Sequence, residues 1–120
     1  MIFISIALRS EAIPIIEKFN LKEEEFPGKF SIYSNGQVKL VITGIGKINS
    51  AIGTTMLLLK NNAKPDDVSL NIGICGSNDA GKSIGNIFLI HKITDISTGK
   101  DYYPDMSDNP FTEAAITTSD

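Results

Sequence analysis

Residues 76–83, Gly-Ser-Asn-Asp-Ala-Gly-Lys-Ser, match the phosphate-binding pattern G-x-x-x-x-G-K-[ST] at every position. They follow an apolar run over residues 68–75, as a phosphate-binding loop follows a strand. Such a loop needs a helix that begins at its Lys-Ser, because the free N–H groups of that helix bind the phosphates. Residues 84–91 instead form a short β-branched and aromatic block, which predicts a buried strand. We therefore interpret the octapeptide as a turn between strands. Its solvated tip would comprise Asn78, Asp79, Gly81 and Lys82.

Glu11 follows the apolar block 2–7 and lies near the start of a predicted helix. A partly desolvated carboxylate at the end of a strand can take a proton from water. Ligand crevices in open α/β sheets also lie at the carboxyl ends of strands. The alternative is that Glu11 is only a first-turn acid that favours the helix dipole, and the residue pattern by itself favours this second interpretation.

Three other positions have chemistry-bearing residues. Gly44-Ile45-Gly46 lies between a predicted strand and a predicted helix, but Asn49 takes the place of the third glycine of a dinucleotide-binding loop. The single cysteine, Cys75, excludes an intrachain disulfide and is interpreted as a small buried apolar residue. His91, the only histidine, is interpreted as a strand residue without a catalytic role.

The elements that must position these residues follow an α/β order. Apolar blocks and periodicity predict strands over 2–7, 30–33, 38–42, 68–75, 84–94 and 114–118, and helices over 10–20, capped by Ser10, and 48–61. Residues 22–29 and 95–110 are predicted to be mainly loops. This order predicts a mixed central sheet flanked by helices.

The sequence also predicts one turn and one helix face. Asn35-Gly36 predicts a hairpin, because this pair readily takes the positive φ angles of a tight turn. In the second helix the periodicity predicts an apolar face. That face comprises Ala51, Ile52, Thr55, Leu58 and Leu59.

Composition narrows the class of protein. The 120 residues carry a net charge of −3, which indicates no nucleic-acid partner, and the length fits one domain. The N-terminal apolar block is too short for a signal peptide or a membrane span. We expect a cytoplasmic protein that needs no metal and no cofactor.

Three segments together resemble the nucleoside phosphorylase superfamily. They are Ile6-Ala7-Leu8-Arg9-Ser10-Glu11, Thr43-Gly44-Ile45-Gly46-Lys47-Ile48-Asn49-Ser50-Ala51 and Asn71-Ile72-Gly73-Ile74-Cys75-Gly76. Their order and spacing are most similar to the methylthioadenosine/S-adenosylhomocysteine nucleosidases, which cleave a purine from a ribosyl sugar with water. The resemblance implies that residues 1–120 are a single domain, the N-terminal half of a nucleoside phosphorylase-like fold that is truncated here.

The resemblance implies a role for six residues. Glu11 matches the carboxylate that positions and activates the attacking water. Ala7 and Leu8 would line the pocket beside the sugar. Ile74, Cys75 and Gly76 match the strand end at the ribose. No metal ligand is implied.

Departures from the family pattern refine the expected reaction. The phosphorylases hold phosphate with an arginine and a hydroxyl residue where this chain has Asn71 and Ile74, so hydrolysis is favoured over phosphorolysis. The nucleosidases usually have a serine at the position of Ile74. The C-terminal half of the family supplies a Met-Glu pair for the ribose and an aspartate that protonates the purine, and neither Glu113 nor Asp120 can replace them. We therefore expect these 120 residues alone to be inactive.

The alternatives are a non-catalytic nucleoside-binding or assembly protein of the same fold, a nucleoside phosphorylase, and a P-loop nucleotide-binding protein. The expected partners are a small-molecule nucleoside and further copies of the chain, as a homodimer or a higher homo-oligomer. In the polar loop 101–106, Tyr102 and Tyr103 either contact a ligand or a neighbouring subunit or pack on their own sheet.

Overall fold

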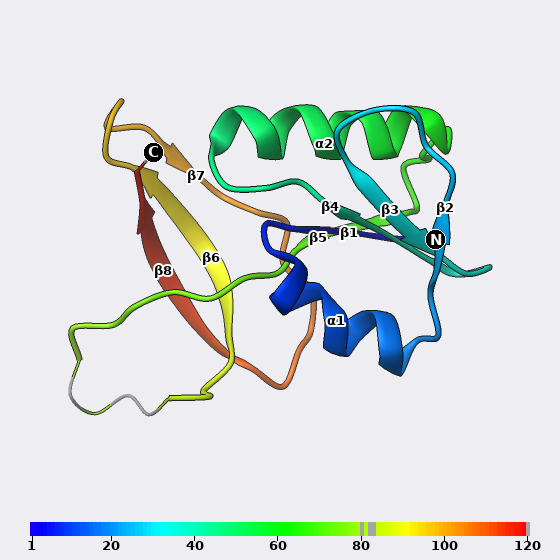
Figure 1. The fold of residues 1–120 in the computed structure, drawn as a ribbon. Coiled ribbons are helices and arrows are strands. Elements are labelled where there is room, and N and C mark those ends of the chain that lie inside the picture. The colour runs from blue at the N-terminus through cyan, green and yellow to red at the C-terminus, as the bar shows by residue number, and fades with distance from the viewer. Residues whose placement is uncertain (80, 82–83, 120) are drawn as a thin grey trace. The chain divides into compact units, whose positions relative to one another are not determined.

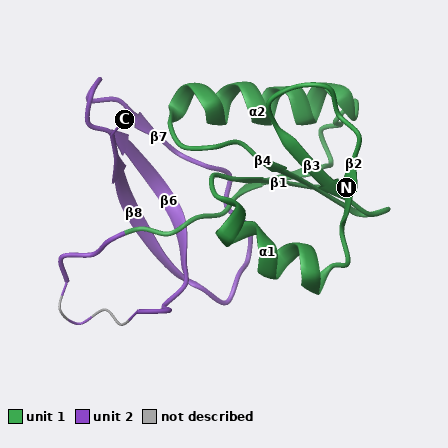
Figure 2. Cartoon of the chain, in the orientation of Figure 1, with its two compact units in different colours: residues 1–75 green, residues 76–120 purple. Residues whose placement is uncertain are grey.

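The computed structural model describes residues 1–79, 81 and 84–119. Backbone contacts divide the chain into two compact units, Met1–Cys75 and Gly76–Asp120 (Figure 2). Each unit contains its own sheet. That residues 1–120 form one domain therefore stays a prediction. Within the described residues, no helix is long and apolar enough to cross a membrane.

The first unit is built on a five-stranded mixed sheet of order β2-β3-β4-β1-β5 (Figure 1). β1 lies parallel to both β4 and β5, whereas β2, β3 and β4 are antiparallel neighbours. The strands are β1 Ile2–Ile6, β2 Lys22–Glu24, β3 Ser31–Ser34, β4 Val38–Ile42 and β5 Val68–Asn71. The predicted mixed sheet is confirmed, while the short edge strand β2 falls in a segment predicted to be loop, because its three charged residues give no apolar signal.

The two helices of this unit, α1 (Arg9–Lys18) and α2 (Lys47–Lys60), cover opposite faces of the sheet (Figure 1). Side chains of β1 alternate between the faces, so Ile4 and Ile6 pack on the α1 side and Phe3 packs on the α2 side. The α1-side cluster comprises Ile4, Ile6, Ala12, Leu21, Tyr33, Val38 and Leu40. The α2-side cluster comprises Phe3, Phe30, Ile32, Val41 and Leu57. Leu8, not Ser10, is the N-cap of α1.

The second helix is confirmed, but most of its predicted apolar face is exposed. Ala51, Ile52, Thr55 and Leu59 are exposed, and of the predicted face only Leu58 packs against the core cluster. The helix instead buries Gly53 and Leu57. A Cβ on Gly53 would lie 2.8 Å from Thr43 Cγ2, so the absence of a side chain lets the helix approach β4 closely. Thr54 adds a side-chain hydrogen bond of 2.7 Å to Ser5 of β1.

The predicted hairpin of β3 and β4 is confirmed, but its turn has a different chemistry from the one predicted. Among the described residues, Asn35 and Gly36 are not in the positive-φ region. Asn35 is instead the first residue of the turn, and its Oδ1 accepts hydrogen bonds of 2.8 Å from the backbone N–H groups of both Gln37 and Val38. Self-capping by an asparagine side chain therefore closes this turn.

The second unit is a three-stranded sheet of order β7-β6-β8. β6 (Phe88–Asp95) pairs with β8 (Thr112–Thr118) in parallel and with β7 (Asp101–Tyr102) in antiparallel orientation. β6 begins four residues later than predicted, because Ile84 and Gly85 form a turn. Tyr102 belongs to β7 and Tyr103 follows it, so the short strand β7 lies in the segment predicted to be loop.

Candidate functional site

The carboxyl ends of three parallel strands, β4, β1 and β5, meet at one edge of the first sheet. Backbone hydrogen bonds continue the pairing just past the strand ends. Gly44 N–H donates to Ala7 O at 3.0 Å, and Ile72 N–H donates to Ser5 O at 3.1 Å. This edge is the part of an open α/β sheet at which ligands bind, so we describe the predicted site residues relative to it.

Glu11 lies in the first turn of α1, directly past the carboxyl end of β1. Its Oε2 accepts a hydrogen bond of 3.1 Å from Leu8 N–H, so the carboxylate folds back over the start of its own helix. The other oxygen, Oε1, has no hydrogen-bond partner within residues 1–79, 81 and 84–119. Glu11 therefore caps the first turn of α1 with Oε2, and its second carboxylate oxygen is available to a ligand.

Ala7 and Leu8 connect β1 to α1 at this edge. Ala7 is half-buried, and its carbonyl is held by Gly44 of the loop after β4. Leu8 is exposed and serves as the N-cap residue of α1. The structure therefore brings Ala7, Leu8 and Glu11 together within five residues of chain, while their roles stay predictions.

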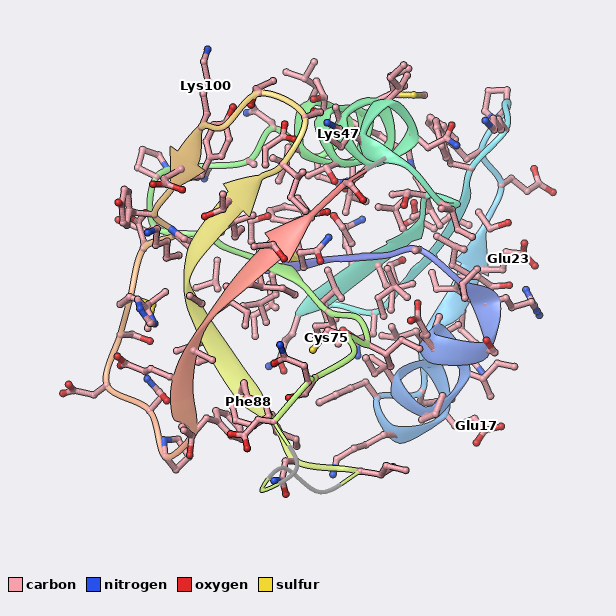
Figure 3. All side chains as sticks on the ribbon, turned by 90° about the vertical axis from the view of Figure 1, so that its left-hand side faces the viewer. Glu17, Glu23, Lys47, Cys75, Phe88 and Lys100 are labelled. Carbon is pink, nitrogen blue, oxygen red and sulfur yellow. The ribbon has the colours of Figure 1, made fainter. Side chains whose placement is uncertain are left out.

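Ile74 and Cys75 lie on the segment after β5, where Figure 3 marks Cys75. β5 ends at Asn71, four residues before the end of the predicted strand. Ile74 is 85% exposed and Cys75 is exposed, so the interpretation of Cys75 as a small buried residue is wrong. Gly76 begins the second unit. The exposure continues that of β5, which is an edge strand of its sheet and whose four residues are all exposed.

The glycine loop between β4 and α2 completes the edge. Gly44 and Gly46 have φ angles of 81° and 103°, which other residues rarely adopt. Asn49 Nδ2 donates to Ile45 O at 2.8 Å, and Lys29 Nζ donates to Asn49 Oδ1 at 2.6 Å, so a lysine from a distant loop fixes this turn. The sequence contained a signal for the glycines but none for Lys29, because the contact spans 20 residues.

The phosphate-loop interpretation does not fit the second unit. Residues 84–87 form a turn and an irregular segment that lead to the strand β6, so none of the described residues 84–95 begins a helix that could bind phosphate. Gly81 N–H donates to Asp79 Oδ1, and Asp79 N–H donates to Ser77 Oγ, which is the local bonding of a turn. Ala80, Lys82 and Ser83 lie outside the described residues.

His91 lies in β6, as predicted, and its side chain is exposed. Within the described part of the chain, no three His, Cys, Asp or Glu side chains are grouped so that they could hold a metal ion. A shallow hollow lined by Glu23, Glu24, Glu25, Phe26 and Pro27 contains none of the predicted site residues.

Proteins similar to this chain in sequence and in fold include several nucleosidases. The chain is 35% identical over 98 residues to the 5'-methylthioadenosine/S-adenosylhomocysteine nucleosidase of Staphylococcus carnosus, which is 78% of this chain and 42% of that protein. The fold is similar to that of Arabidopsis thaliana 5'-methylthioadenosine nucleosidase, with a TM-score of 0.80 and 19% identity over 97% of this chain and 61% of that one. The Neisseria meningitidis nucleosidase in complex with methylthio-immucillin-A gives a TM-score of 0.78, with 20% identity over 99% of this chain and 64% of that one.

These comparisons confirm the predicted resemblance and the nucleoside phosphorylase-like fold. The chain spans less than half the length of the Staphylococcus carnosus relative. No model of a protein family matches the chain.

Proposed function

Because this chain has a nucleoside phosphorylase-like fold and a sequence similar to the methylthioadenosine/S-adenosylhomocysteine nucleosidases, we propose that it belongs to an enzyme that hydrolyses the N-glycosidic bond of a purine nucleoside. The observation that carries the proposal is the 35% identity over 98 residues to a nucleosidase. The position of Glu11 at the carboxyl edge of the parallel strands supports it.

In the proposed reaction, Glu11 takes a proton from water as the water oxygen forms its bond to the anomeric carbon of the ribose. The bond from that carbon to the purine nitrogen breaks, its electron pair goes to the purine, and a proton neutralises the departing base. Ala7 and Leu8 line the sugar side of the pocket, and Ile74, Cys75 and Gly76 lie near the ribose. Asn71 and Ile74 offer no positive charge to a phosphate, which favours water as the nucleophile.

We propose further that the 120 residues do not turn over substrate by themselves. By resemblance, the proton donor to the purine and the ribose-binding Met-Glu pair come from a part of the family beyond these residues. Loss of leaving-group protonation alone lowers a rate by about 10² to 10⁴. The proposed setting is the cytoplasm, where the exposed thiol of Cys75 stays reduced, and the proposed assembly is a homo-oligomer.

The second candidate is a non-catalytic nucleoside-binding protein of the same fold. It is favoured by Ile74, whose exposed isoleucine side chain cannot bond to water or to a sugar hydroxyl.

A chimera separates the two candidates. Residues 1–120 replace the matching N-terminal part of the Staphylococcus carnosus relative, and both adenine release from methylthioadenosine and binding of the nucleoside are measured. Adenine release by the chimera, with none by the 120-residue chain, is the expected result. Binding without release favours the second candidate, and neither binding nor release overturns both.

A further inference from the structure

The first turn of α1 carries Glu11, but the apolar packing of this helix lies mostly beyond that turn. α1 buries Ala12, and the partly buried Ile15 and Ile16, which pack on the same core cluster, belong to its second half. Arg9, the first residue of the helix, is exposed. Polar contacts are therefore important for fixing the first turn on the sheet.

One polar contact joins this turn to a strand that is distant in the sequence. Arg9 Nη1 donates a hydrogen bond of 2.7 Å to the hydroxyl of Tyr33 in β3, 24 residues further along the chain. The guanidinium carbon also lies 5.8 Å from the centre of the Tyr33 ring, which is close enough for a cation–π contact. Tyr33 is only 6% exposed and belongs to the α1-side cluster, so its close-packed ring gives Arg9 a rigid anchor.

The place of Arg9 in the helix is unfavourable for a positive charge, because the N-terminus of a helix repels cations. Two neighbours offset this repulsion. The hydrogen bond to Tyr33 raises the pKa of Arg9, and the carboxylate of Glu23 raises it further. Glu23 of β2 is the register partner of Tyr33, so both groups lie in one row across the sheet. The fold thus keeps an arginine at this end of α1 through two strands that carry none of the predicted site residues.

We propose that Arg9 is a positioning residue for Glu11: its bond to Tyr33 fixes the first turn of α1 and thereby holds the carboxylate at the carboxyl edge of the parallel strands. This inference rests on the proposed function, in which Glu11 is the base. Residues two apart on a helix do not face each other, so Arg9 acts on Glu11 through the backbone. The hydrogen bond of 3.1 Å from Leu8 N–H to Glu11 Oε2 ties the carboxylate to that backbone, so a shift of the turn moves the carboxylate with it.

The first test measures adenine release from methylthioadenosine by the chimera that carries residues 1–120, at a temperature at which every variant is folded. Arg9→Ala and Tyr33→Phe should each lower kcat by about 10-fold and change KM by less than about twofold, because they misplace the base without removing a contact to the nucleoside. The double variant should be no slower than either single one, since both changes remove the same contact. Arg9→Lys, which keeps a donor, should restore part of the rate. Lys18→Ala, which removes a positive charge from the last turn of the same helix, is the control and should keep kcat within about twofold.

The second test follows the first turn of α1 directly, by amide hydrogen exchange of the same chimeras. The N–H groups of Glu11 and Ala12 report on this turn, because they donate to Leu8 O at 3.1 and 3.2 Å. Arg9→Ala should raise the exchange rates of both by about 10-fold, since the turn loses a hydrogen bond from a charged donor. The N–H of Ser50, which closes the first turn of α2, is the control and should exchange at an unchanged rate.

The outcomes separate this inference from the proposed function. If the unsubstituted chimera releases adenine and Arg9→Ala and Tyr33→Phe keep its kcat, the positioning role is overturned and the role proposed for Glu11 stands. Faster exchange in the first turn of α1 with an unchanged kcat also overturns it, because the contact then only stabilises the helix. Losses in kcat that multiply in the double variant contradict a shared contact. An unsubstituted chimera that releases no adenine overturns the proposed hydrolysis, and the positioning role with it.

Discussion

The two faces of α2 differ in residue size: the face on the sheet is mostly small residues, and the exposed face carries more of the large apolar side chains. The inner face, which packs on the sheet, includes Gly53, Thr54 and Leu57, and Leu57 is its one large buried side chain. The outer face carries Ile48, Ile52 and Leu59 in the open. Small inner residues let the helix backbone approach β4 and leave room for the Ser5–Thr54 hydrogen bond, while the larger apolar area points away.

Which face of a helix packs on a sheet therefore depends on how closely the helix backbone can approach the strands, as well as on how much apolar area is buried. A helix that rests on a sheet through glycine and threonine gains dispersion contacts over its backbone. The following predictions test each side of that contrast, in order of decreasing effect.

Leu57→Ala should lower the free energy of unfolding by about 2–5 kcal/mol, because the fully buried side chain leaves a cavity in the α2-side cluster. Leu59→Ala removes the same atoms from an exposed position on the outer face of α2 and should change the free energy of unfolding by less than about 0.5 kcal/mol. Urea denaturation at a low protein concentration measures both. Equal losses in the two variants would contradict the assignment of inner and outer faces.

Glu24→Gln should lower the free energy of unfolding by about 2 kcal/mol near neutral pH. Glu24 accepts hydrogen bonds from Lys60 of α2, from Ser34 and from Lys39, and these hold its pKa at about 2, below the ordinary 4.5. The carboxylate therefore stabilises the fold above pH 4.5, and this contribution is lost as the pH falls from 4.5 to about 2.

The difference between wild type and Glu24→Gln should accordingly shrink between pH 6 and pH 2.5 in urea titrations. Glu25→Gln, at an exposed neighbouring position, serves as the control and should show little difference at either pH. A gap that is the same at both pH values would show that the ion pairs do not fasten the last turn of α2.

Gly53→Ala should destabilise the fold by about 1 kcal/mol, although alanine is the better helix former. The new Cβ would lie 2.8 Å from Thr43 Cγ2 and 3.4 Å from Phe30 Cδ1. In a Thr43→Ser background the nearest methyl group is gone, so the same change should become neutral or slightly stabilising. A thermal-melt cycle of the four proteins checks this, and a stabilising Gly53→Ala in the wild type would contradict the close approach.

Much of the fold could be predicted from the sequence because it depends on local signals. The apolar block at Ile2–Ile6, the asparagine turn at Asn35 and the periodicity of residues 48–61 each specify an element within a short window. The face of α2 could not be predicted in this way. Its orientation is set by the contact of Gly53 with Thr43, and nothing in helical periodicity marks a glycine as the packing surface.

The candidate site was predicted only in part for a similar reason. Glu11, Ala7 and Leu8 are adjacent in the chain, so a strand followed directly by a helix brings them to one edge. Ile74 and Cys75 follow the exposed edge strand β5, and the order of strands in a sheet depends on tertiary pairing that a local pattern does not reveal. The contact of Lys29 with Asn49 is likewise a tertiary contact without a local signal.

The most direct test of the account is the rate of adenine release from methylthioadenosine by the chimera that carries residues 1–120. Glu11→Gln should lower kcat by about 10² to 10⁴, because the proposed base loses its charge. Glu17→Gln, an exposed glutamate on the same helix (Figure 3), should leave kcat within about twofold. A Glu11→Gln chimera that hydrolyses the nucleoside as fast as the Glu17→Gln chimera would contradict the assignment of Glu11 as the base.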